Sequence, residues 1–258
     1  MRPGSLGMCL CGLLMLIGCA RNPKNPDPLI EINRWMYGFN EVLDRHVLKP
    51  ASDAYIKLLP EQSRRGIGNA FDNLGEPYWA LNHLLQGRFG RALGSAGRFG
   101  VNSTVGAFGL SDVAGQWGIA RHKNDLGRTL GKAGVGPGPY LVLPLFGPST
   151  ARDAPGLLAA MYTNPMRWVD LTLLESLSLT AAGVVDSRWR IDPEIRFREK
   201  AAIDPYVFTR EAYLQRRNAL IRGEDAQGPG PDPYEDPAGA STQPAAVPAP
   251  SASRSASG

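Results

Sequence analysis

Apolar residues recur at helical spacing through most of the chain between residues 29 and 222. The pattern, together with proline and glycine boundaries, predicts a mostly helical body. The Asn164-Pro165 and Asp204-Pro205 pairs are typical of a helix cap followed by a first turn. The predicted helices span residues 30–47, 51–59, 62–73, 77–85, 88–105, 166–184 and 205–222.

A different pattern covers residues 131–147. This stretch is apolar, but glycine or proline interrupts it every few residues, so it cannot form a long helix. We predict a loop or a short hairpin that presents the residues from Tyr140 to Phe146. An apolar, irregular segment of this kind must pack into a core or face another apolar phase.

The first residues have the layout of a signal peptide. Arg2 supplies the positive charge, residues 8–17 form an apolar run, and Leu16-Ile17-Gly18-Cys19 resembles the bacterial lipobox. We predict that residues 1–18 are removed and that lipid is attached to Cys19; the alternative is an ordinary secretory signal with a coincidental cysteine. Ala20 stands where an aspartate commonly marks inner-membrane retention, which favours the outer membrane.

The two ends of the mature chain differ from its body. Residues 19–28 form a short polar tether that contains proline, and residues 29–222 form the helical domain. From residue 223 to residue 258 the composition shifts to proline, alanine, serine and glycine, which bury little apolar surface. We therefore predict that residues 223–258 are disordered.

The helices leave two placements open. Several are apolar over a broad arc but too short to span a bilayer, which takes about 20 apolar residues. They could pack on one another in a soluble core, which periodicity alone favours, or lie at a membrane interface. An anchor at Cys19 would hold the body against the bilayer and strengthens the second placement.

Composition and chemistry argue against several functions. The net charge of +4 is too small and too dispersed for nucleic-acid binding. All cysteines lie at or before Cys19, so the mature body has no disulfide or cysteine metal site. His46, His83 and His122 lie in separate segments without metal-ligand spacing, and residues 127–132 lack the spacing of a phosphate-binding loop. We predict no metal, no cofactor and no enzymatic activity.

Polar and glycine residues form motif blocks in a defined order along the body. The first block contains Asn33, Tyr37, Asn40 and Asp44, the second Asn73, Glu76 and Pro77, and the longest Gly134, Gly136, Gly138 and Tyr140. From Asp27 to about Arg222 the series resembles the MlaA, or VacJ, family of outer-membrane lipoproteins. The run from Tyr37 to Leu43 is slightly shorter here than in some members, which affects the local helix register.

The resemblance implies a fold, a location and a function. Members resemble a ring of amphipathic helices with a central polar channel and a Gly/Pro-rich loop, lying in the inner leaflet of the outer membrane. They remove mislocalised phospholipids from the outer leaflet and pass them to a periplasmic carrier protein, and they associate with porin trimers. Gly134, Gly136 and Gly138 match the mobile channel-side loop; the alternative is that they only form tight turns.

Two other classes of function remain open at this stage. One is a structural envelope lipoprotein or tether without transport activity, which would need no polar pore. The other is a lipid-processing hydrolase, which would need a nucleophile and a base within reach of each other in a pocket.

Overall fold

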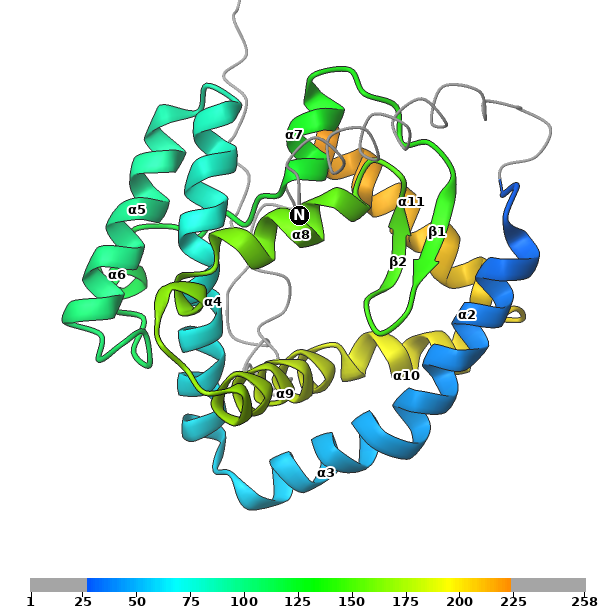
Figure 1. The fold of residues 1–258 in the computed structure, drawn as a ribbon, viewed down its shortest axis with the longest axis horizontal. Coiled ribbons are helices and arrows are strands. Elements are labelled where there is room, and N and C mark those ends of the chain that lie inside the picture. The colour runs from blue at the N-terminus through cyan, green and yellow to red at the C-terminus, as the bar shows by residue number, and fades with distance from the viewer. Residues whose placement is uncertain (1–26, 224–258) are drawn as a thin grey trace, which may run out of the picture. The chain divides into compact units, whose positions relative to one another are not determined.

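The structure, a computed structural model, describes residues 27–223 (Figure 1). The predicted signal peptide, Cys19 and residues 224–258 of the predicted tail lie outside the described residues. The elements in chain order are α2 (Ile30–Leu43), the π-helix η2 (Asp44–Leu48), α3 (Lys49–Leu58), α4 (Glu61–Leu85), α5 (Phe89–Thr104), α6 (Val113–Gln116), α7 (Leu126–Lys132), β1 (Tyr140–Leu143), β2 (Gly147–Thr150), α8 (Ala154–Thr163), the 3-10 helix η3 (Pro165–Trp168), α9 (Leu173–Arg190), α10 (Asp192–Ala201) and α11 (Pro205–Arg222).

The predicted mostly helical fold is confirmed, and so is the hairpin alternative for residues 131–147. Strands β1 and β2 pair antiparallel, from Tyr140 opposite Thr150 to Leu143 opposite Gly147. The last predicted helix is confirmed to the residue, because Asp204 accepts hydrogen bonds from the backbone N–H groups of Tyr206 and Val207.

Two predicted boundaries are wrong. Residues 62–73 and 77–85 belong to the single helix α4, with Pro77 in its interior. Packing along α5 holds both halves in line and outweighs the backbone hydrogen bond that proline lacks. Asn164 caps only the short η3, whereas α9 begins later at a capping box in which Thr172 and Glu175 bond each other's backbone N–H.

Other elements carried too weak a pattern to be predicted. Helices α6, α7, α8 and α10 are short, so each offers few turns over which an apolar periodicity can be recognised. Helix α7 depends on Asp125, which caps it by accepting from the N–H of Arg128. The predicted break near Pro50 is also absent, because η2 runs directly into α3 and places Pro50 in its first turn.

The contacts between elements run in a closed circuit, which can be followed in Figure 1. From α2 the circuit passes through η2 to α3, then to α9, α4, α8, α7 and α11, and returns through β2 and β1 to α2. Helix α10 adds a bridge between α9 and α11, and α5 packs along α4. Segments far apart in sequence, such as α3 and α9, are therefore direct neighbours.

Candidate functional site

The interior of the described residues is polar, whereas large apolar side chains are exposed. The buried hydrophobic residues are Tyr78, Ala114, Tyr140, Val142 and Tyr206. The buried polar and charged residues are more numerous and include Asn33, Asn73, Glu76, Asn82, Arg98, Asn102, Arg128, Arg152, Asp153, Asp186 and Arg188. Soluble proteins show the opposite distribution, because lone charges are costly to bury and apolar surface is costly to expose.

A first ion cluster joins α4, α5 and α6. The Arg98 side chain is 1% exposed and donates to Glu76 Oε1 at 2.7 Å and to both carboxylate oxygens of Asp112 at 2.7 and 2.8 Å. Arg121 also donates to Asp112, at 3.1 Å, and to Asp72, at 2.7 Å. The cluster pairs cations with carboxylates, so the charges are buried without being left alone.

The carboxyl groups of this cluster differ in pKa. Burial raises the pKa of Glu76, which is fully buried, and the hydrogen bond from Arg98 offsets this only in part. Burial also acts on Asp112, but hydrogen bonds from Arg98 and Asn102 outweigh it and lower its pKa. Asp112 therefore holds its negative charge more firmly than Glu76 does.

A second ion cluster joins α7, α8 and α11. Arg217 donates to both oxygens of Asp125, at 2.7 and 2.8 Å, and to Asp153 at 3.0 Å. Asp153 also accepts from Tyr213, at 2.8 Å, and from Arg152. Burial opposes the charge on Asp153, but bonds from Arg152 and the charge of Arg217 outweigh it and lower its pKa. Gly127 lies against this cluster, because a Cβ atom there would collide with Asp153 and Arg217.

The first motif block contacts the hairpin and α9. Asn33 and Asn40 bond the backbone of β1 and of the turn after it, at 2.9 Å in each case. Tyr37 packs edge-on against Tyr206, with ring centroids 5.7 Å apart. Asp44 accepts two hydrogen bonds from Arg188 of α9. The structure thus places three of these residues along α2 and Asp44 at the start of η2, where each supports a neighbouring element.

The second motif block lies inside the α4–α5 packing. Asn73 is buried and donates to Ser103 Oγ at 2.9 Å. Glu76 belongs to the Arg98 cluster, and Pro77 is the proline inside α4. These residues therefore hold helices together.

The glycines of the longest block lie in an exposed segment that leads into β1. Gly134 and Gly138 adopt positive φ angles of 90° and 66°, which L-residues avoid. No side chain or backbone atom lies within 4 Å of a Cβ position built on Gly134 or Gly136. Tyr140 follows as a buried residue whose pKa is raised by burial. The segment is open on its outer side and anchored at Tyr140.

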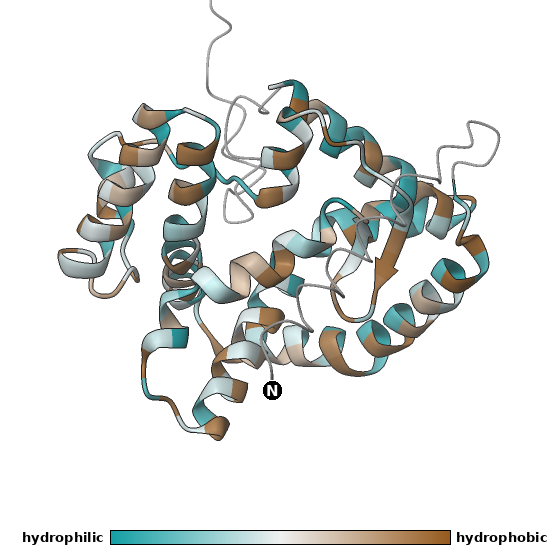
Figure 2. Cartoon of the chain, turned by 45° about the horizontal axis from the view of Figure 1, so that its top comes forward, coloured by the Kyte–Doolittle hydropathy of each residue, from teal (hydrophilic) through white to brown (hydrophobic). Residues whose placement is uncertain are grey.

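Large apolar side chains are exposed on several helices. The exposed fractions of Leu173 and Leu174 on α9 are 77% and 75%, and Trp35, Leu93 and Trp168 are similarly exposed on other elements. In Figure 2 hydrophobic and hydrophilic positions alternate along the helices, while β1 is hydrophobic over most of its length. The helices of the described residues thus expose large apolar side chains while many of their polar side chains are buried.

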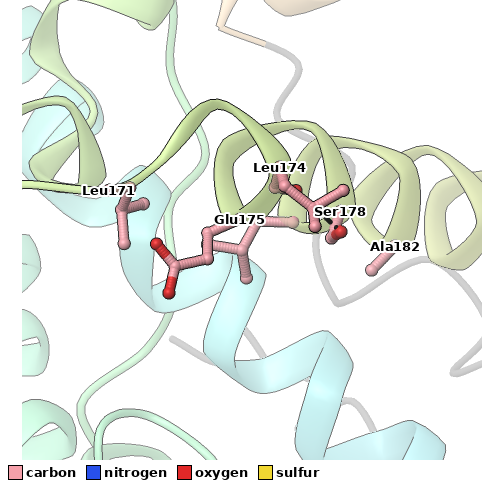
Figure 3. A pocket seen from close by; sticks show the side chains of 6 residues that line it. Leu171, Leu174, Glu175, Ser178 and Ala182 are labelled. Atoms are coloured by element: carbon pink, nitrogen blue, oxygen red, sulfur yellow. Dashed lines mark hydrogen bonds between the residues drawn. The ribbon is translucent and has the colours of Figure 1, made fainter.

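Helix α9 carries an open groove on this surface. Leu171, Leu174, Glu175, Ser178, Leu179 and Ala182 line it, and its volume is about 640 Å³. Figure 3 shows these side chains pointing to one side of the helix, with the Glu175 carboxylate beside Leu171. Glu175 is held by the capping box with Thr172, whose hydrogen bonds lower its pKa. The groove is thus an apolar surface with one carboxylate at its end.

Two features are absent from residues 27–223. None of the helices in that range is both long enough and apolar enough to cross a bilayer. The same residues contain no group of three or more His, Cys, Asp or Glu side chains placed to hold a metal ion. His83, for example, bonds the carbonyl of His122 and the amide of Asn124.

Comparison with known proteins identifies the family. The MlaA lipoprotein family matches residues 25–220, which include the whole of the fold up to the last turn of α11. The chain belongs to the MlaA lipoprotein family. This confirms the resemblance found in the motif blocks, and the family is one of transport-system lipoproteins.

Individual relatives of the MlaA family cover most of the chain. An Escherichia coli relative, named intermembrane phospholipid transport system lipoprotein MlaA, is 32% identical over 88% of this chain and 90% of its own length. A Haemophilus influenzae protein of the same name is 32% identical over 83% of this chain and 89% of its own length. An uncharacterised Rickettsia bellii protein is 34% identical over 76% of this chain and 77% of its own length.

A solved structure shares the MlaA fold. It comes from work on the structural basis for maintenance of bacterial outer membrane lipid asymmetry, with a TM-score of 0.66 and 35% identity. The match covers 76% of this chain and 98% of the solved one.

Sequence reasoning did not single out the ion clusters as site residues. Arg98, Asp112, Asp153 and Arg217 are central to the structure but were not among the predicted site residues. The periodicity carried no signal for Arg98: at about 100° per residue it lies on the face of the predicted helix 88–105 opposite Phe89, Leu93 and Ala96, where an amphipathic helix is expected to place solvated charges.

Proposed function

We propose that this chain removes mislocalised phospholipids from the outer leaflet of the outer membrane and passes them to a periplasmic carrier protein, which maintains lipid asymmetry. The observation that carries the proposal is the combination of a polar, ion-paired interior with an exposed apolar surface. The names of the Escherichia coli and Haemophilus influenzae relatives point to the same transport system.

The physical basis is the cost of moving a lipid head group through an apolar layer. A charged or polar head group loses its hydration there, and this costs several kcal/mol or more. A channel walled by polar groups replaces that hydration, while acyl chains stay in the bilayer. The closed circuit of element contacts supports a ring with a central polar channel. Lipid then moves down its own gradient, without a covalent step or a nucleotide.

We place the protein in the periplasm-facing inner leaflet of the outer membrane, with lipid on Cys19. Each buried methylene of an acyl chain contributes about 0.8 kcal/mol, so more than one chain gives stable anchoring. The exposed leucines and tryptophans would then face acyl chains instead of water. Porin trimers and the periplasmic carrier are the proposed protein partners.

The Gly134–Gly138 segment is the proposed hinge of a channel-side loop that ends at Tyr140. Its support is the positive φ of both end glycines and the open space beside Gly134 and Gly136. Glycine allows such a segment to change conformation at low cost.

Deletion of the gene tests the proposal directly. We expect phospholipid to accumulate in the outer leaflet and the cells to become sensitive to detergent, measured by surface labelling of lipid and by growth in sodium dodecyl sulfate. The wild-type gene should reverse both effects, whereas the Cys19→Ala variant should not. An unchanged outer leaflet in the deletion strain would contradict transport and favour a tether.

A further inference from the structure

Two asparagine side chains of α2 bond the backbone of the hairpin. Asn33 donates to the Tyr140 carbonyl and accepts from the Val142 N–H, both at 2.9 Å. Asn40 donates to the Leu143 carbonyl and accepts from the Leu145 N–H, again at 2.9 Å. The Asn33 amide therefore bonds a carbonyl and an N–H two residues apart on the free edge of β1, as a neighbouring strand would do. The Asn40 amide bonds the residues on either side of Pro144, where the hairpin turns.

The spacing of the two contacts fits both elements. Asn33 and Asn40 are seven residues apart, which is about two helical turns or roughly 10.5 Å of rise. Their contacts on the hairpin are centred on Leu141 and Pro144, three residues apart, or roughly 10 Å of strand. Because the two repeats match, one face of α2 bonds the hairpin at two points.

The Asn33 contact is fixed from several sides. Asn33 is buried, and its amide also donates to Asp27 Oδ1 at 2.9 Å. Asp27 in turn accepts hydrogen bonds from Tyr206 and Arg210 of α11. This end of β1 also contains the buried side chains of Tyr140 and Val142, which pack with Tyr206. Movement here would break a connected buried network.

The Asn40 contact is much less supported. Asn40 is only half-buried, and the turn that it bonds exposes Leu145 by 66% and Phe146 by 53%. Leu145 has a φ of 68°, a left-handed conformation that costs a non-glycine residue about 1–2 kcal/mol. Gly147, at the end of the turn, has a φ of 74° and open space around it. The Asn40 amide bonds both the residue before this turn, Leu143, and Leu145 within it, while the Leu143–Gly147 strand pair closes the turn.

We propose that Asn33 and Asn40 form a two-point latch, with a fixed point at Asn33 and a releasable point at Asn40. When the Asn40 bonds open, the turn from Pro144 to Phe146 moves relative to α2 while β1 stays in place. Asn40 is thus a positioning residue for the hairpin. The latch itself follows from the contacts of the hairpin; only its link to lipid passage, which this movement would accompany, rests on the proposed function.

Hydrogen–deuterium exchange tests the latch in the full-length lipoprotein. The protein is placed in vesicles of phosphatidylethanolamine and phosphatidylglycerol, and exchange is resolved to single amides by fragmentation in the mass spectrometer. In the wild type the Val142 amide should exchange at least tenfold more slowly than the Leu145 amide. Asn40→Ala should accelerate Leu145 on the order of fivefold, as loss of one hydrogen bond implies, and leave Val142 unchanged.

Three further variants separate the latch from general destabilisation. Asn40→Asp keeps the size of the side chain but removes the N–H donor to the Leu143 carbonyl. In this variant too the Leu145 amide should exchange faster than in the wild type. Asn33→Ala should accelerate exchange at both the Val142 and the Leu145 amides. Asn69→Ala on α4 is the matched control and should change neither rate. The latch is overturned if Leu145 is insensitive to Asn40→Ala, or if Val142 accelerates with it, since the hairpin would then open as one unit.

A cell assay connects the latch to transport. Cells that produce Asn40→Asp at the wild-type level should accumulate outer-leaflet phospholipid, at least twofold above wild type. Accelerated Leu145 exchange with wild-type lipid levels would overturn the link between the latch and transport. The gene deletion, by contrast, tests the proposed function itself, so the two failures are distinguishable.

Discussion

The charged cluster around Arg98 is buried, whereas the face of α9 that carries Leu173 and Leu174, here called its outer face, is exposed. Soluble proteins show the reverse distribution of charged and apolar side chains. Arg98 and Glu76 have side chains exposed by 1% and 0%, whereas Leu173 and Leu174 are exposed by 77% and 75%. In water this arrangement forgoes the hydrophobic burial that stabilises most domains. It is favourable only if the outer face meets an apolar phase and the inner charges are paired.

The contrast also shows what holds each region. Between α4, α5 and α6, charge-assisted hydrogen bonds fix the helices, and removal of one partner leaves a charge buried without compensation. On α9 the leucines contribute little to folding because they pack against few neighbours. Mutations in the two regions should therefore affect different measurements: stability for the cluster and membrane affinity for the outer face.

The largest effect is expected from Arg98→Ala. Buried Glu76 would lose its direct hydrogen bond from Arg98 and keep only the more distant cation Arg121, whose Nε lies 3.7 Å from Glu76 Oε1, so we expect a loss of about 3–5 kcal/mol in the free energy of unfolding. Denaturant unfolding of the detergent-solubilised protein measures it. Arg65→Ala is the control, because the Arg65–Glu61 pair on α4 is exposed and should contribute about 0–1 kcal/mol. Equal losses in the two variants would contradict a structural role for the buried cluster.

A smaller effect, in a different measurement, is expected from Leu174→Asn. Leu174 lines the groove of Figure 3, and a leucine buried in acyl chains contributes about 1.5–3 kcal/mol relative to an exposed one. We expect roughly tenfold to hundredfold weaker partitioning of the unlipidated protein into phospholipid vesicles, measured by flotation, with unchanged thermal unfolding in detergent. Ser178→Asn in the same groove is the control and should partition like wild type. If Leu174→Asn also partitions like wild type, α9 does not face the membrane.

The smallest effects distinguish a glycine in the polar interior from one on an open helix face. Gly127→Ala would place a methyl group against Asp153 and Arg217, which should cost about 1–3 kcal/mol. Gly97 of α5 has open space at its Cβ position, so Gly97→Ala should stabilise by about 0.5–1 kcal/mol through helix propensity. Thermal unfolding in detergent measures both. Effects of the same sign would mean that the Gly127 backbone moves away from the cluster at low cost.

Local signals account for the elements that were predicted correctly. Asp204 caps α11 with its own side chain, and the glycines and prolines between Gly131 and Gly147 prevent a helix there. These effects act within a few residues, so the sequence alone reveals them. At Pro77 the local signal was misleading, because contacts between α4 and α5 overrode it.

The candidate site could be predicted only as a set of residues. The motif blocks and the family resemblance identified Asn33, Asn40 and Glu76, but not what they contact. Asn40 meets Leu145 across 105 residues, and Glu76 meets Arg98 across 22. Such pairings arise from tertiary packing, and no periodicity encodes them.

The sequence by itself determined the mostly helical body, the cap of its last helix, the interruption of helix over residues 131–147 and the family, because these depend on short-range sterics and on the order of residue types along the chain. Only the tertiary structure decided which charges are buried together and which leucines remain outside. Both arginine and leucine fit an amphipathic helix on either face, and the face that turns inward is settled by the partners that neighbouring helices supply.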